Sequence, residues 1–205
     1  MEAIMPVTVN EANGRVIYRC EEWGAQPPHH ASAATTPRHV VVHHMDWPNR
    51  PLYSLAAPAL AQAFSVARRC QAGHFANGWA DTGQHFTITR EGVILEGRHG
   101  SLAAAQAGHC IRGAHAADPD TGADDNDSWG IECEGTYTTE HMPAQQWEAL
   151  VDLVSWLCHQ TKLPSMAVIG HRQTGCRTAC PGDWLFAQLP LLRQAVHTRL
   201  EGLNS

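Results

Sequence analysis

Short β-branched runs alternate along this chain with longer segments of helical periodicity, and this alternation restricts its fold more than any other feature. Runs typical of buried strands occupy residues 39–44, 84–89, 92–98, 129–137 and 166–171. Apolar residues recur at helical spacing over residues 53–72, over the segment that Pro143 opens, and over about 183–200. Because helices fall between strands, we expect an α/β fold with a single mixed central β-sheet flanked by helices.

The length of 205 residues fits one domain of ordinary size. We interpret residues 1–20 as a strand-poor N-terminal lead-in and residues 21–205 as the single domain. Residues 101–128 are rich in Gly, Ala and Asp, which predicts a long loop of the kind that often binds ligands. Two predicted strands flank Arg90, Glu91 and Gly92, so we expect a β-hairpin there.

Charge and cysteine content argue against several classes of protein. The net charge is −6 and no basic cluster exceeds the Arg68–Arg69 pair, so we expect no nucleic-acid partner. The seven cysteines form no CxxC pair, which is a poor disulfide framework and leaves a thiol free. We find no apolar run long enough to span a membrane and no signal peptide at the N-terminus. We therefore expect a cytoplasmic protein or export by a non-Sec route.

Three residues with metal-binding side chains stand at matching places in this pattern. His43 and His171 each end an apolar strand, and Cys180 follows nine positions after His171 in a Cys-Pro-Gly sequence. A lone histidine on a strand is more often a core residue, so the three residues indicate a metal site only when they are taken together. Structural zinc is usually closed by four protein ligands, whereas catalytic zinc keeps three and leaves a position for water. The set therefore predicts a zinc site of the catalytic kind.

Eight motifs in order along the chain resemble the peptidoglycan recognition proteins and the related zinc-dependent N-acetylmuramoyl-L-alanine amidases, most closely a bacterial, actinobacterial-type branch. They are EEWGAQPP (21–28), VVVHHM (40–45), GWADTGQHF (78–86), GVILEGRHGSL (92–102), GAHA (113–116), NDSWGIECEGTY (126–137), VIGHRQ (168–173) and TACPGDWLF (178–186). The resemblance implies the fold of that family and Zn²⁺ on His43, His171 and Cys180. It also implies peptidoglycan or muropeptides as partners. The implied reaction is hydrolysis of the amide between the lactyl group of N-acetylmuramic acid and L-alanine of the stem peptide.

The resemblance also suggests which group transfers the proton. In the anhydro-muramyl amidases, a carboxylate in a motif similar to Gly130-Ile131-Glu132 is catalytic, so we favour Glu132 as the base. Animal and phage relatives carry a tyrosine where this chain has Gln84, and an amide cannot act as an acid or base. Glu134 is the reserve choice, with the alternative that it simply faces solvent or an arginine.

The other roles that the resemblance implies are less specific. Thr178 takes a position where some relatives place an oxyanion-stabilising lysine, and Arg177 and His85 are alternative donors. The step from His171 to Cys180 is one residue longer than in many relatives, and Cys176 adds a second thiol; we assign the ligand to Cys180 because it lies in the matching motif. Candidates for substrate contact, each with a packing role as the alternative, are His44, Trp47, Gln84, His85, Arg98 and His115.

Two further interpretations stay open. Some members of this family bind peptidoglycan without cutting it, and these usually lose a zinc ligand; Cys180 and Glu132 are both present here, which favours the enzyme. The same chemistry would also serve either a cytoplasmic recycling enzyme or a delivered lytic effector or endolysin. The lytic role would bring an immunity protein or a delivery system as a further partner.

Overall fold

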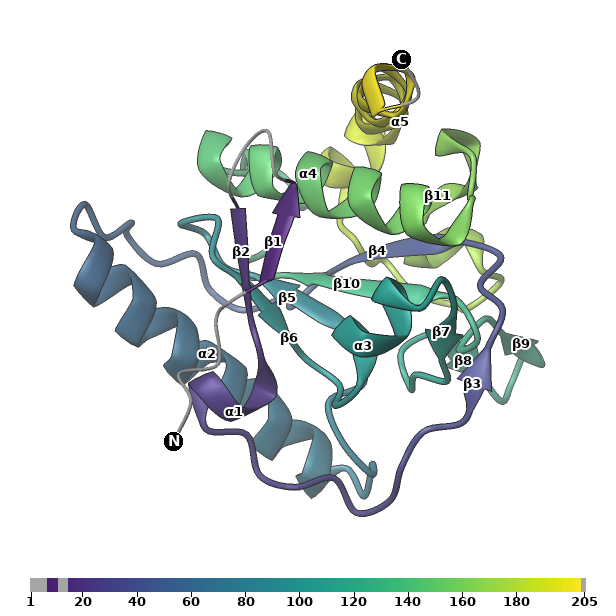
Figure 1. Ribbon diagram of the computed structural model, residues 1–205, viewed down its shortest axis with the longest axis horizontal. Coiled ribbons are helices and arrows are strands. Elements are labelled where there is room, and N and C mark those ends of the chain that lie inside the picture. Colours follow the sequence, from purple (N-terminus) through teal and green to yellow (C-terminus); the bar gives the residue numbers. More distant parts are fainter. Residues whose placement is uncertain (1–6, 11–14, 204–205) are drawn as a thin grey trace.

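A seven-stranded mixed β-sheet forms the centre of the computed structural model, which describes residues 7–10 and 15–203 (Figure 1). Its strands are β1 Val7–Asn10, β2 Arg15–Tyr18, β4 Val40–His44, β5 Phe86–Ile88, β6 Ile94–Glu96, β10 Trp129–Cys133 and β11 Val168–Gly170. They lie in the order β1-β2-β6-β5-β10-β4-β11. The expected single mixed sheet is therefore confirmed.

The strands that carry the candidate site run parallel to one another. Strand β10 pairs in parallel with β4 and with β5, and β4 pairs in parallel with β11. Residues Val40–Val42 are fully buried, as expected for parallel strands covered on both faces. Strands β5 and β6 form the predicted antiparallel hairpin. The carboxyl ends of β4, β10 and β11 consequently lie together at one edge of the sheet.

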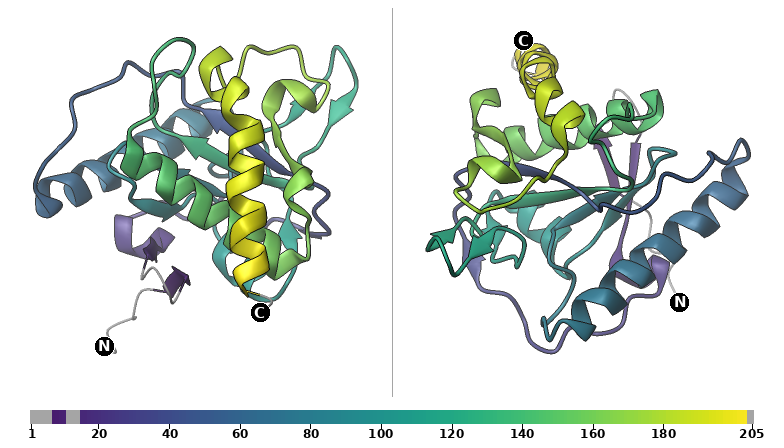
Figure 2. Two further views of the ribbon diagram at one scale, coloured as in Figure 1. Left: turned by 90° about the horizontal axis from the view of Figure 1, so that it is seen from above. Right: turned by 180° about the vertical axis from the view of Figure 1, so that it is seen from behind.

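Helices cover the two faces of the sheet unequally (Figure 2). Helices α4 (Ala144–Thr161) and α5 (Asp183–Leu203) lie on one face, over the main hydrophobic core. Helix α2 (Ala56–Ala76) lies on the other face and packs, with the short α1 (Cys20–Trp23), on a small cluster. The buried members of that cluster are Cys20, Trp23, Ala63, Ala67 and Leu95. None of these residues belongs to β4 or β10, and the buried polar side chains of those two strands are His43 and Glu132.

Two expectations about the less regular parts were wrong. Residues 1–20 are not strand-poor, because β1 and β2 lie there and β2 pairs in parallel with β6. Residues 101–128 are more than a loop: they contain helix α3 (Ser101–Gln106), whose sequence SLAAAQ is rich in strong helix formers. Short strands also lie there, β7 Cys110–Ile111 against β3 Ala34–Thr35, and β8 Ala117–Asp118 against β9 Ala123–Asp124.

The predicted helices lie close to their expected bounds. Helix α2 begins two residues before Pro58, and α4 begins directly after Pro143.

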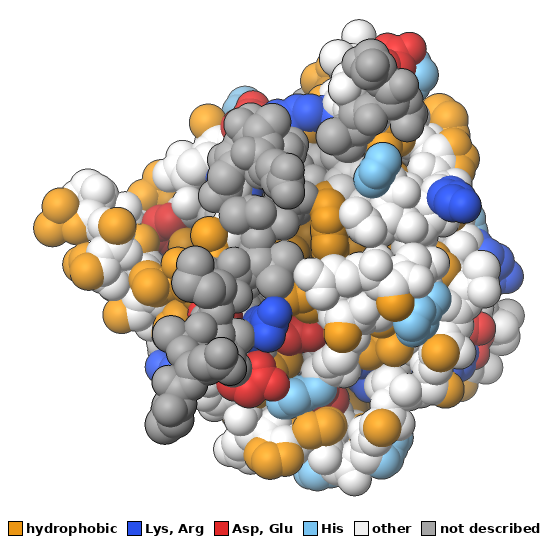
Figure 3. Space-filling view, in the orientation of Figure 1, with side chains coloured by type: hydrophobic (Ala, Val, Ile, Leu, Met, Phe, Trp, Pro, Cys, Tyr) orange, Lys and Arg blue, Asp and Glu red, His pale blue; other side chains and the backbone are white. Residues whose placement is uncertain are grey.

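No helix among the described residues is long and apolar enough to cross a membrane. All seven cysteines are free, so no disulfide holds the fold together. On the face shown in Figure 3, Lys and Arg side chains are scattered among neutral and apolar ones.

Candidate metal centre and active site

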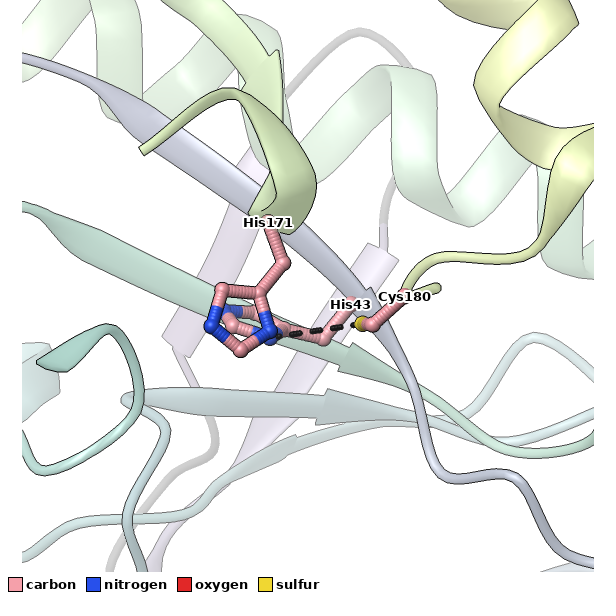
Figure 4. A group of neighbouring side chains, drawn as sticks. All are labelled: His43, His171 and Cys180. Atoms are coloured by element: carbon pink, nitrogen blue, oxygen red, sulfur yellow. Dashed lines mark hydrogen bonds between the residues drawn. The ribbon is translucent and has the colours of Figure 1, made fainter. Parts of the chain in front are cut away.

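The structure brings His43, His171 and Cys180 together at the carboxyl ends of β4 and β11 (Figure 4). His43 lies in β4, His171 follows β11 directly, and Cys180 comes from the loop before α5. Their candidate ligand atoms all lie within 4.8 Å of one another. Residues far apart in the sequence thus form one cluster, as the strand-end argument predicts.

The spacing of this cluster matches what zinc requires. The Cys180 sulfur lies 3.6 Å from Nδ1 of His43. Zinc bonds of about 2.3 Å to sulfur and about 2.05 Å to nitrogen, at a tetrahedral angle, place these two atoms about 3.6 Å apart. Donor types and spacing therefore both fit a metal held by three protein ligands.

Burial sets the protonation of these groups. It lowers the pKa of His43 well below its usual value and lowers the pKa of His171 to about 4, so both rings are neutral and keep a lone pair. Burial also raises the pKa of the Cys180 thiol, and the nearby Glu132 raises it further. A thiol in this setting ionises when a metal coordinates it, and otherwise its S–H donates to Nδ1 of His43.

The loop that presents Cys180 is held at both ends. The backbone N–H of Arg172 donates to the Cys180 carbonyl at 3.1 Å, and its guanidinium donates to Asp183 at 2.7 Å. Gly182 has φ +90°, and a Cβ there would lie 2.4 Å from the carbonyl oxygen of Tyr137. Only glycine fits that position. These contacts hold the segment between His171 and Cys180 in place. The role of Arg172 is not among the predicted ones, although Arg172 lies in the VIGHRQ motif.

The second thiol of this loop lies apart from the cluster. Cys176 lines a pocket of about 310 Å³ next to His171, together with Arg177 and Thr178. It does not belong to the group of converging ligand atoms. The geometry therefore favours Cys180 as the third ligand.

Glu132 lies beside His43 on the same face of the sheet. The two residues are partners in the parallel pairing of β10 with β4, so their side chains point the same way from strands about 4.8 Å apart. The Glu132 side chain is 4% exposed, its Oε1 has no hydrogen-bond partner, and burial raises its pKa to about 8. A buried carboxyl group, with no ion-pair partner among the described residues, thus lies next to the metal cluster.

Glu134 has a different environment, although it is equally buried. Arg50 donates to both of its carboxylate oxygens, at 2.7 and 2.8 Å, and also holds Glu91. The alternative that Glu134 faces an arginine is therefore confirmed. Glu132 remains the candidate for proton transfer.

The candidates for oxyanion stabilisation differ in what already holds them. The Thr178 hydroxyl accepts the backbone N–H of Cys180 at 3.1 Å, which leaves its own proton available to a ligand. The guanidinium of Arg177 pairs with Asp118 and Asp120 across the pocket. Arg177 is therefore less available than Thr178.

Three of the expected substrate contacts have side chains that lie inside the protein. His85 is fully buried, its Nδ1 accepts the N–H of Gly130 at 2.9 Å, and its Nε2 donates to the carbonyl of Ile111 at 2.6 Å. Arg98 is 4% exposed and donates to the Ser32 hydroxyl at 2.8 Å. His115 lies behind His43, and burial lowers its pKa to about 4. In this structure the three side chains have the packing role given as the alternative, and their contact with a substrate stays a prediction.

The remaining three expected contacts lie nearer the surface or keep free polar atoms. Trp47 is half-buried, the guanidinium of Arg69 stacks on its ring at 4.1 Å, and both line a pocket of about 240 Å³ beside α2. His44 is half-buried, and its Nδ1 accepts the backbone N–H of Tyr137 at 3.1 Å. Gln84 is buried, with an amide oxygen that has no hydrogen-bond partner. Trp47 is the best placed of them to touch a bound ligand.

The sequence of the chain is similar to that of known proteins. A family model described as N-acetylmuramoyl-L-alanine amidase matches residues 33–183. The chain is 29% identical to peptidoglycan-recognition protein LB of Drosophila melanogaster, over 95% of this chain and 76% of that protein. It is 31% identical to an N-acetylmuramoyl-L-alanine amidase of Sus scrofa, over 72% of this chain and 22% of that protein.

Solved structures show the same fold. Wild-type Drosophila PGRP-LB matches with a TM-score of 0.66 at 28% identity, covering 84% of this chain and 91% of that one. A point mutant of the same protein, in complex with tracheal cytotoxin, matches with a TM-score of 0.67 at 27% identity, covering 84% and 92%. The expected family fold is confirmed, while the bacterial branch stays a prediction.

Proposed function

Because the chain belongs to the N-acetylmuramoyl-L-alanine amidase family, we propose that it is a zinc-dependent amidase acting on peptidoglycan or muropeptides. The bond cut is the amide between the lactyl group of N-acetylmuramic acid and L-alanine. The observation that carries the proposal is the pairing of a three-ligand cluster with a buried carboxyl group on the adjacent strand, whose Oε1 has no hydrogen-bond partner among the described residues. A protein that only binds peptidoglycan needs neither feature.

His43, His171 and Cys180 would hold the zinc ion, and three ligands leave one coordination position for water or substrate. When bound, zinc supplies a Lewis acid that polarises the scissile carbonyl and lowers the pKa of a water molecule towards ~7. The protein's own contribution is to keep both imidazoles neutral and to hold the ligand loop through Arg172.

Glu132 is the group that moves the proton in this proposal. Its carboxylate accepts a proton from the attacking water and returns it to the amine that leaves, because one residue can serve as base and then as acid. Burial raises the pKa of Glu132 to about 8 in the metal-free protein, and the positive charge of a bound zinc ion would favour the carboxylate that the first step needs. Gln84 has no group that exchanges protons, so the carboxylate takes the part that a tyrosine is expected to play in animal relatives.

Hydrolysis of a defined muropeptide, followed by mass spectrometry, tests this proposal. The zinc-loaded wild type should release the free stem peptide. Glu132→Gln should keep its zinc and lose activity by about 10²–10⁴-fold, the usual contribution of a positioned acid–base group. Glu134→Gln is the matched control, because it changes the neighbouring glutamate that Arg50 already holds, and it should keep most of the activity.

Two results would contradict the proposal. If the zinc-loaded wild type binds the muropeptide and releases nothing, the protein is a peptidoglycan-binding member of the family. If Glu132→Gln keeps full activity, the proton is transferred by another group.

A further inference from the structure

A chain of hydrogen bonds leads from the metal cluster into the protein behind His43. Nε2 of His43 lies 3.0 Å from Nδ1 of His115, and Nε2 of His115 lies 3.0 Å from the carbonyl oxygen of Ser128. His43 and His115 are 2% and 6% exposed, so water has little access to either ring. Each ring nitrogen on this path therefore depends on its protein partner.

The direction of these hydrogen bonds follows from the last acceptor. A carbonyl oxygen only accepts, so Nε2 of His115 carries the proton, and Nδ1 of this neutral ring is an acceptor. Nε2 of His43 must then be the donor to it. Because a neutral imidazole carries one proton, Nδ1 of His43 is left with its lone pair, facing the sulfur of Cys180.

The His115 ring has little freedom to move. A Cβ at Gly130 would lie 2.7 Å from Cγ of His115, and a Cβ at Gly113 would lie 2.6 Å from its Cδ2. The ring therefore packs directly against the backbone at both glycines. The side-chain oxygen of Asn126 accepts the backbone N–H groups of His115 and Ala116, at 2.7 and 2.8 Å.

The final acceptor is fixed as well. The Ser128 hydroxyl donates to Asp125 at 2.8 Å. Asp125 in turn lies 2.7 Å from Nδ1 of His39, the residue that directly precedes β4. The turn that holds the Ser128 carbonyl is thus tied to the strand that carries His43. Both ends of the hydrogen-bond path are anchored to one rigid element.

We propose that His115 is a positioning residue that fixes His43 as its Nε2–H tautomer and aims Nδ1 of His43 at the metal. This inference rests on the zinc centre of the proposed function. Partners of this kind fix the orientation and tautomer of a ligating histidine, and their loss typically weakens metal binding by about 10–100-fold. The proposal also gives the GAHA and NDSWG motifs a role at a site to which they supply no ligand.

Zinc affinity in a set of His115 variants tests the proposal, measured by competition with a chromophoric chelator on protein whose folding is checked by circular dichroism. His115→Phe keeps a ring and removes both hydrogen bonds, so it should bind zinc about 10–100-fold more weakly. His115→Asn keeps an acceptor near the Nδ1 position and should lose less. His74→Phe is the matched control, because His74 lies outside the ligand cluster, where its Nδ1 accepts the backbone N–H of Gly83, and zinc affinity should stay unchanged.

Gly130→Ala provides a second route to the same effect, because its new methyl group displaces the His115 ring without altering a polar group. It should also weaken zinc binding. If either His115→Phe or Gly130→Ala folds and binds zinc as tightly as the wild type, the proposal is wrong.

The tautomer itself is measured by long-range ¹H–¹⁵N NMR on histidine-labelled, metal-free protein. His43 should carry its proton on Nε2 in the wild type and lose this single tautomer in His115→Phe. A wild-type His43 with its proton on Nδ1 would overturn the inference whatever the zinc data show. A wild type that binds no zinc would instead overturn the metal centre of the proposed function.

Discussion

Replacing Glu132 by glutamine should change how the stability of the metal-free protein depends on pH. Burial raises the pKa of this carboxyl from 4.5 to about 8 in the folded protein. Between these two values the folded state keeps the proton and the unfolded state releases it. Unfolding therefore becomes easier as pH rises, and the stability that the proton provides is lost as pH passes about 8.

The size of the effect follows from linkage. One pH unit inside this window is worth about 1.4 kcal/mol, and integration from pH 5 to pH 8 gives roughly 3–4 kcal/mol. Glu132→Gln cannot release a proton, so its free energy of unfolding should gain about this much relative to the wild type over that range. The burial that raises the pKa supports the full figure, because only 4% of Glu132 is exposed.

Urea denaturation in the presence of a chelator and a reductant, at pH 5, 6.5 and 8, measures the difference. All other titrating groups are shared by the two proteins and largely cancel. Glu134→Gln is the control of opposite sign, because it removes the negative charge and one of the two acceptor oxygens that Arg50 binds, and it should lose about 1–3 kcal/mol. If the difference between Glu132→Gln and the wild type changes by less than about 0.5 kcal/mol over this range, the carboxyl is not desolvated as we argue.

Three further outcomes are expected. Cys180→Ala should lose zinc in a metal-content assay while Cys176→Ala keeps it, and the reverse result would move the ligand to the second thiol. Arg50→Ala should lower the free energy of unfolding by about 2–4 kcal/mol, because it leaves Glu134 buried without its partner; a change near zero in chemical denaturation would refute that pairing. Gly182→Ala should weaken zinc binding and lower the melting temperature, because its φ of +90° and its contact with Tyr137 exclude a side chain; an unchanged affinity would show that the ligand loop tolerates a shift.

The parts of this fold that sequence could predict are those with strong local signals. The run before His43 is recognisable because it is apolar and β-branched, and the helix that follows Pro143 because its periodicity is long and regular. Strand β2 was missed because a run of four residues carries too little periodicity, and it forms through pairing with β6, which lies more than seventy residues away.

The same distinction holds for the site. His43 and His171 could be placed in one cluster because parallel strands bring their carboxyl ends to one edge. The roles of His115 and Glu134 depended on tertiary contacts with His43 and Arg50, which no local pattern encodes. Histidine and glutamate side chains that look equivalent in the sequence differ in role because they contact different groups in the folded protein.

The most direct test of the account is a zinc titration of the metal-free protein, with release of stem peptide from a defined muropeptide as the readout. Activity should be absent without metal and should rise to a plateau at one zinc ion per chain, because His43, His171 and Cys180 form the one converging ligand group found among the described residues. Full activity in the presence of a strong chelator, or no activity after one equivalent of zinc is bound, would contradict the account.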